Sequence, residues 1–153
     1  MLLHIDFLQY KDQLKIKQID AQPHLYDPIR KKFLRLSPEE LVRQLLLHYL
    51  INELNYNKQR ISLERQLMVN ERERRFDVLV YRTDMEPFLL VECKAPNVPL
   101  QQSTFEQVVQ YNLPLQVPYL LITNGIRSYC CMIDYLSRDY QFLDQLPLYP
   151  SEI

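Results

Sequence analysis

Asp77, Glu92 and Lys94 are the residues whose types and spacing are best suited to chemistry, because two carboxylates and a lysine lie at the ends of two apolar runs. Successive side chains of a strand alternate between its faces, so Glu92 and Lys94 should share one face while Cys93 points the other way. Paired carboxylates bind hard cations such as Mg²⁺ or Mn²⁺, and a lysine beside them can orient the attacking water or neutralise charge on a phosphate. The pattern therefore indicates metal-assisted hydrolysis.

The two runs that carry these residues, 76–81 and 88–94, are rich in Val, Leu and aromatic side chains. The polar stretch 82–87 between them is typical of a turn, so we expect an antiparallel hairpin. With the turn centred between residues 84 and 85, three pairs of residues should lie opposite each other: Asp77 and Glu92, Leu79 and Leu90, and Tyr81 and Phe88.

If Asp77 lies opposite Glu92, their Cβ atoms are about 5 Å apart, and like charges so placed destabilise a sheet unless a cation offsets the repulsion. A divalent metal ion would do so. The alternative is that both are carboxylates at the rim of the sheet that pair with Arg75 and Lys94, because an Asp and an E-x-K are short and common patterns.

Five sequence blocks in order give a more specific indication: PEELVRQ (38–44), RFD (75–77), LVECKAP (90–96), QVVQYN (107–112) and TNG (123–125). Together they resemble the N-terminal nuclease domain of type I restriction enzyme R subunits, within the PD-(D/E)XK nuclease superfamily. The resemblance extends from about residue 30 to residue 134.

The resemblance implies a role for each matching residue. Asp77, Glu92 and an acid of the first helix, Glu40, would surround an Mg²⁺ or Mn²⁺ ion, to which the carbonyl of Cys93 adds a ligand. Lys94 would assist the water. Gln107 and Tyr111, four residues apart on one helix face, match a Q-x-x-x-Y motif that helps to position substrate or catalytic side chains.

Two of these assignments have structural alternatives. Ser37-Pro38-Glu39-Glu40 is also a capping box, with Ser37 as the N-cap, so Glu40 can serve the helix end instead of the metal. Glu39 is an alternative acid, although it points about 100° away around the helix. Gln107 can equally be an exposed side chain while Tyr111 packs on the sheet.

The elements that must position these residues follow from hydrophobic periodicity. We expect a helix at 38–54, strands at 60–69, 76–81 and 88–94, a helix from 103 or 104 to before Pro114, a strand at 119–123, and a last strand at 127–134 after the Asn124-Gly125 turn. This αβββαβ order predicts an α/β fold with a restriction-endonuclease-like core, in which helices flank a mixed central sheet. Residues 36–153 would form the nuclease-like domain, and residues 1–35 a short strand or helix packed on it.

Composition limits the function further. With Gly125 as the single glycine, a Gly-rich phosphate loop is excluded, so the translocating motor of R subunits is not expected in this chain. The formal charge of −1 argues against tight unaided binding to DNA. The chain has two local basic clusters, which either contact phosphate or are solvated charge runs. The first consists of Arg30, Lys31, Lys32 and Arg35, and the second of Arg72, Arg74 and Arg75.

The chain should therefore be cytoplasmic, since it shows neither a signal peptide nor a membrane span, and its three cysteines form no disulfide framework. The leading hypothesis is a magnesium-dependent deoxyribonuclease, more specifically an endonuclease. It would act on DNA, with a separate motor or recognition subunit or as a homodimer. The alternatives are a non-catalytic module that binds nucleic acid or forms complexes, and a structural protein in which the three polar residues form a rim ion-pair network.

Overall fold

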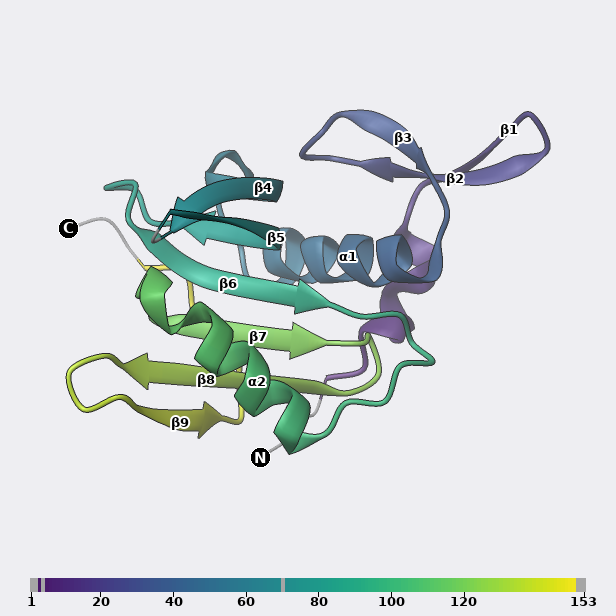
Figure 1. Ribbon diagram of the computed structural model, residues 1–153. Coiled ribbons are helices and arrows are strands. Elements are labelled where there is room, and N and C mark those ends of the chain that lie inside the picture. Colours follow the sequence, from purple (N-terminus) through teal and green to yellow (C-terminus); the bar gives the residue numbers. More distant parts are fainter. Residues whose placement is uncertain (1–2, 4, 70, 151–153) are drawn as a thin grey trace.

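The computed structural model describes residue 3 and residues 5–69 and 71–150. Its main element is a sheet with the strand order β4-β5-β6-β7-β8-β9 (Figure 1). Neighbouring strands are antiparallel except β6 and β7, which run parallel. The strands are β4 (Ile61–Val69), β5 (Arg72–Tyr81), β6 (Pro87–Cys93), β7 (Tyr119–Thr123), β8 (Ser128–Asp134) and β9 (Asp139–Leu143).

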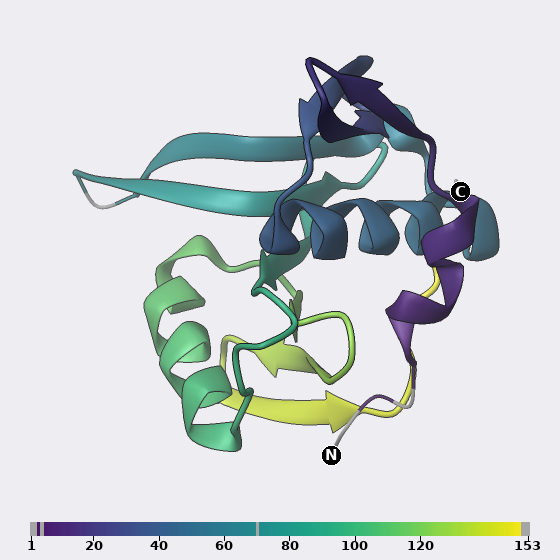
Figure 2. The ribbon, with the colours of Figure 1, turned by 90° about the vertical axis from the view of Figure 1, so that its right-hand side faces the viewer.

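Two helices cover opposite faces of this sheet, as Figures 1 and 2 show. The first, α1 (Pro38–His48), continues into a π-helical turn (Tyr49–Glu53), and α2 (Gln102–Asn112) ends in a short 3-10 turn (Leu113–Leu115). Leucines and Val42 of α1 pack on one face against Val78 and Leu89. Phe105 and Val109 of α2 pack on the other against Leu90. Each helix thus buries one apolar stripe on the sheet, as an amphipathic helix must.

The order α1-β4-β5-β6-α2-β7 confirms the predicted αβββαβ core and the parallel crossover between β6 and β7. The expectation that 127–134 is the last strand was wrong, because β9 pairs with β8 and closes the sheet at that edge. This strand is five residues long, and its Tyr140 and Phe142 pack beside Phe105. So short a run gives little periodic signal in the sequence.

The hairpin between β5 and β6 has the predicted register along most of its length, with Leu79 opposite Leu90. Near the turn the prediction was wrong, because Tyr81 pairs with Pro87 and the register shifts between Val80 and Tyr81. The cause is the loop, in which Arg82 N–H donates to Glu86 O at 2.8 Å and Met85 adopts φ 69°. Such a three-residue loop with a left-handed third residue offsets the strands by one, and a bulge must restore the pairing.

The N-terminal segment folds into more structure than a single strand or helix. After a 3-10 helix (Phe7–Gln13), β1 (Ile16–Ile19), β2 (Gln22–Asp27) and β3 (Lys32–Arg35) form a separate antiparallel sheet above the start of α1 (Figure 1). The β1–β2 turn is tight, with Asp20 and Ala21 both at positive φ (52° and 60°). This turn lacks the Asn-Gly or Asp-Gly pair typical of such hairpins, so it could not be predicted from local sequence. Phe7 N–H donates to Gly125 O at 2.9 Å and anchors the segment on the core.

Among the described residues, no helix combines the length and the apolar character that are needed to cross a membrane.

Candidate active site

The Asp77 carboxylate lies where the pairing between β5 and β6 stops. The last backbone pair is Val78 with Val91, and beyond it Asp77 Oδ2 accepts the N–H of Cys93 at 2.8 Å. The other oxygen, Oδ1, accepts from Arg43 Nη2 of α1 at 3.3 Å. Two donors from different elements therefore fix the orientation of this carboxylate, which is 19% exposed.

Glu92 is half-buried next to Asp77, near the end of β6. Burial raises the pKa of Glu92 to about 8, and the Asp77 carboxylate adds to the rise, while Lys94 opposes it. Desolvation and a nearby like charge both disfavour the ionised form of a carboxyl group. A proton on Glu92 and a bound cation therefore offer two ways to relieve the same repulsion.

Within the E-x-K segment, Cys93 points away from the acidic pair, as predicted. Cys93 is buried in the core layer that faces α1, with its pKa raised well above the usual value by burial and by Asp77. Lys94 follows the end of β6, is half-buried, and its N–H donates to Thr123 O of β7 at 2.8 Å. Among the described residues, the Lys94 ammonium has no carboxylate within 4.0 Å, so its charge reaches Glu92 through space rather than through an ion pair.

Glu40 does sit at the capped end of α1, since Ser37 Oγ accepts its N–H at 3.1 Å. Its carboxylate does not return to Ser37 but bridges two arginines: Oε1 accepts from Arg30 Nη2 at 2.6 Å and Oε2 from Arg43 Nη1 at 2.7 Å. Arg43 thus stands between Glu40 and Asp77. The alternative acid, Glu39, is half-exposed and pairs with Arg43 at 3.3 Å.

The ion pairs continue from Glu40 into the β2–β3 hairpin. Asp27 is fully buried and accepts from Arg30 Nε at 2.6 Å and from Gln44 Nε2 of α1 at 3.0 Å. Burial alone would raise the pKa of Asp27, but the hydrogen bonds from the Arg30 backbone and side chain and from Ile29 N–H outweigh it and lower the pKa. A continuous chain of charged contacts therefore joins the N-terminal sheet, α1 and β5.

The two basic clusters differ in their surroundings. Arg30 belongs to the ion-pair chain just described, whereas Lys31 and Lys32 are exposed. Arg75 is 64% exposed and pairs with Glu64 at 3.5 Å. The side chains of Arg72 and Arg74 lie outside the described residues.

The Q-x-x-x-Y pair lies on the outer part of α2. The buried positions of this helix are Phe105, Val109 and Asn112, and Gln107 is exposed while Tyr111 is 49% exposed. Gln107 lines a shallow hollow together with Tyr140 of β9. Among the described residues it forms no hydrogen bond with Asp77, Glu92 or Lys94, so a role at the site remains a prediction.

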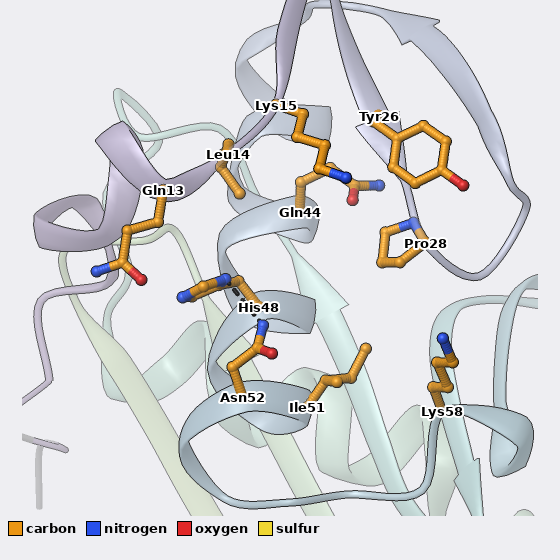
Figure 3. Close-up of a pocket in the computed structure, with 10 residues that line it drawn as sticks. All are labelled: Gln13, Leu14, Lys15, Tyr26, Pro28, Gln44, His48, Ile51, Asn52 and Lys58. Carbon is orange, nitrogen blue, oxygen red and sulfur yellow. Dashed lines mark hydrogen bonds between the residues drawn. The ribbon is translucent and has the colours of Figure 1, made fainter.

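Several hollows lie beside α1, and two of them border its charged and polar side chains. The first is bordered by Ser37, Glu39, Glu40, Arg43 and Glu64 and adjoins Asp77 through Arg43. The second hollow has a volume of about 240 Å³. It lies between the N-terminal segment, the β2–β3 hairpin and the side of α1 that carries Gln44 and His48 (Figure 3). Gln44, His48 and Lys58 are among its lining residues, but none of the predicted site residues is, so it is separate from the candidate site.

The donor set near Asp77 suits a hard cation. Among the described residues no group of three or more His, Cys, Asp or Glu side chains is arranged around one metal position. Two carboxylates suffice for Mg²⁺ or Mn²⁺, which keep waters and substrate phosphate as their other ligands. The crowding of Asp77 and Glu92, expressed in the raised pKa of Glu92, is the observation that fits such an ion.

Sequence reasoning missed Asp27, Arg43 and Glu64 as parts of the site. Arg43 was visible in the PEELVRQ block, but two of its four partners, Glu64 and Asp77, come from strands that are distant in sequence. A polar residue in the second turn of a surface helix is usually solvated, so spacing alone gave no sign of burial.

The order of elements and the position of the acidic pair define an α/β domain with a restriction-endonuclease-like core. The sequence model of the family described as "Type I restriction enzyme R protein N terminus" matches residues 38–147, and the chain belongs to this family. This confirms the likeness that the five sequence blocks had suggested.

A solved structure is also similar to the chain: a fragment of a putative HsdR subunit of a type I restriction enzyme from Vibrio vulnificus YJ016. The sequence identity is 21%, the TM-score is 0.49, and the match covers 73% of this chain. It covers 24% of the other chain, so the present chain spans about a quarter of that fragment. No curated protein matches the chain.

Proposed function

We propose that this protein is a metal-dependent nuclease that hydrolyses phosphodiester bonds of DNA, more specifically an endonuclease. The observation that supports it best is the convergence of Asp77 and Glu92, two carboxylates whose mutual repulsion calls for a cation, with Lys94 on the same strand end. Perturbed carboxyl groups of this kind cluster at functional sites. The family match supports the proposal by placing the chain among R-subunit N termini.

The residues divide the chemistry as follows. Asp77 and Glu92, together with the Cys93 carbonyl, would hold Mg²⁺ or Mn²⁺, which polarises the scissile phosphate and lowers the pKa of bound water. The fixed orientation of Asp77 presents its remaining lone pairs without rearrangement. Lys94 orients the attacking water or neutralises the charge that develops on the phosphate. Gln107 and Tyr111 would contact the DNA from α2.

The partners follow from the family description. An R protein belongs to a type I restriction assembly, so we propose that this domain acts on DNA beside a motor or recognition subunit. A homodimer is the alternative arrangement for cutting both strands. The formal charge of −1 agrees with a dependence on partners, because the chain carries little net attraction for phosphate of its own.

Cleavage of linear, nicked, supercoiled and single-stranded DNA by the purified protein in Mg²⁺ or Mn²⁺ tests the proposal. Asp77→Asn and Lys94→Gln should each reduce cleavage by at least about a hundredfold. Asp84→Asn serves as the matched control, since Asp84 lies exposed in the β5–β6 turn. Cleavage that survives in both site variants would contradict the assignment.

A second candidate is a non-catalytic module that binds nucleic acid or forms a complex. The contact of Arg43 with Asp77 favours it, because an arginine already neutralises part of the acidic site. This function predicts DNA binding in Ca²⁺ without turnover in Mg²⁺ or Mn²⁺. A gel-shift assay and the cleavage assay, run on the same preparation, separate the two.

A further inference from the structure

Arg43 contacts more carboxylates than any other described side chain. Its guanidinium lies 2.7 Å from Glu40 and 3.3 Å from each of Glu39, Glu64 and Asp77, while only 5% of the side chain is exposed. Burial alone would lower the pKa of Arg43, but Glu40 and Asp77 outweigh it and raise the pKa. The group is therefore a permanent positive charge inside the site.

The two ends of the guanidinium are used differently. Nη1 donates to Glu40 and faces Glu64, whereas Nη2 is shared between Glu39 and Asp77. The planar fork thus contacts two acids at each end, and its Nη2 joins Glu39 of α1 to Asp77 of β5. A lysine could not span them, because it offers one compact charge instead of a rigid pair of donors.

Glu40 has little capacity left for a metal ion. Each of its oxygens already accepts a short charge-assisted hydrogen bond, one from Arg30 and one from Arg43. A divalent cation on Glu40 would also have to lie next to the Arg43 charge, in surroundings too dry to screen the repulsion. Asp77 differs from Glu40, because its contact with Arg43 is longer, 3.3 Å instead of 2.7 Å. Its other neighbour, Glu92, forms no ion pair with an arginine among the described residues.

We propose that Arg43 determines where this site binds a cation: its guanidinium takes the place between Asp77 and the acids of α1 and β4, so that a divalent ion binds at Asp77 and Glu92 and not at Glu39, Glu40 and Glu64. The inference rests on the proposed metal-dependent function, and it names Arg43 as the residue that restricts the position of the metal ion. Glu40 is then a positioning residue that holds Arg43, and Arg30 and Asp27 hold Glu40 in turn.

Titration of the full chain with Mn²⁺, followed by calorimetry and by electron paramagnetic resonance of the free ion, tests this inference without measuring activity. The wild-type protein should bind one Mn²⁺. Arg43→Gln should bind a second, and the double variant Arg43→Gln/Glu40→Gln should lose it again. Absence of a gain in folded Arg43→Gln overturns the inference.

The second variant is Glu40→Gln alone, with Arg43 unchanged. It tests the inference even if Arg43→Gln does not fold. The amide keeps the shape of the side chain, and circular dichroism checks the fold of each variant. The dissociation constant for Mn²⁺ should change by less than about threefold. Weakening by about tenfold or more would show that binding of the ion depends on Glu40, as ligand or support, and would overturn the inference.

Failure of the proposed function has a different signature. If Asp77→Asn leaves Mn²⁺ binding unchanged, the ion is not at Asp77, and the metal-dependent nuclease is contradicted. The additional Mn²⁺ expected in Arg43→Gln is counted relative to the wild-type protein, whether or not the wild-type protein binds an ion at Asp77. A gain that depends on Glu40 therefore supports the role of Arg43 even when the nuclease proposal fails.

Discussion

The side chain of Asp77 accepts the backbone N–H of Cys93 at 2.8 Å and so replaces a ladder hydrogen bond at the point where β5 and β6 separate. One residue therefore closes the end of the hairpin and presents a carboxylate to Glu92. The fold and the proposed chemistry both depend on the Asp77 carboxylate. Substitutions of Asp77 should separate its contribution to stability from its contribution to cleavage.

Asp77→Asn and Asp77→Ala should differ in stability but not in activity. The Asn side chain retains an acceptor for the Cys93 N–H, whereas Ala leaves this donor unpaired at a cost of about 1–3 kcal/mol. Urea unfolding of both variants measures the difference, and both should have lost metal-dependent cleavage. Equal stabilities would show that the hydrogen bond contributes little to the hairpin.

The stability of the metal-free protein should fall as the pH rises, because of Glu92. Burial beside Asp77 raises the pKa of Glu92 to about 8 from a usual value of 4.5. Between these pH values the folded chain holds a proton that the unfolded chain has released, so the contribution of Glu92 to the free energy of unfolding is largest below 4.5 and decreases up to about 8. Glu92→Gln cannot ionise and should show a flatter dependence.

Urea unfolding in a chelator at about pH 5, 6.5 and 8 measures this slope. Glu86→Gln, at an exposed position of the turn, is the control and should keep the wild-type dependence. The same slope in Glu92→Gln and in the wild-type protein would show that another group causes it.

The sequence allowed the prediction of the core elements because each has a clear period. The alternation in 88–94 predicted the burial of Cys93 in the core, and the hairpin predicted the pairing of Leu79 with Leu90. Those features depend on residues that are close in sequence.

The surroundings of Asp77 could not be predicted in this way. Arg43, Arg30 and Asp27 become one chain of contacts only when the β2–β3 hairpin packs on α1. That hairpin turns through a non-glycine residue at positive φ, Lys31. In the sequence, Arg30 belonged to a basic cluster with the appearance of a solvated surface. Tertiary packing converted it into a partner of Asp27 and Glu40.

Asp27→Ala should destabilise the protein by about 3 kcal/mol, since it removes the buried partner of the half-buried Arg30. Asp27 is fully buried and its lowered pKa means that it stabilises the fold above pH 3.8, an effect that is lost as the pH falls further. Thermal and urea unfolding should show the loss, and the exposed control Asp12→Ala should lie within about 0.5 kcal/mol of the wild-type protein. A small effect of Asp27→Ala would mean that Glu40 and Glu64 hold Arg30 without it.

Gly125→Ala should destabilise the turn that joins β7 to β8. Gly125 adopts φ 90°, and a Cβ atom there would lie 3.3 Å from Cγ2 of Val42 in α1. Backbone strain of this kind costs about 1–3 kcal/mol, and the contact would also push α1, which carries Arg43, away from the sheet. We therefore expect both a lower free energy of unfolding and weaker Mn²⁺ binding at Asp77. The double variant Gly125→Ala/Val42→Ala removes the contact but keeps the strain, so recovery of Mn²⁺ affinity without full recovery of stability would assign the two effects to their separate causes.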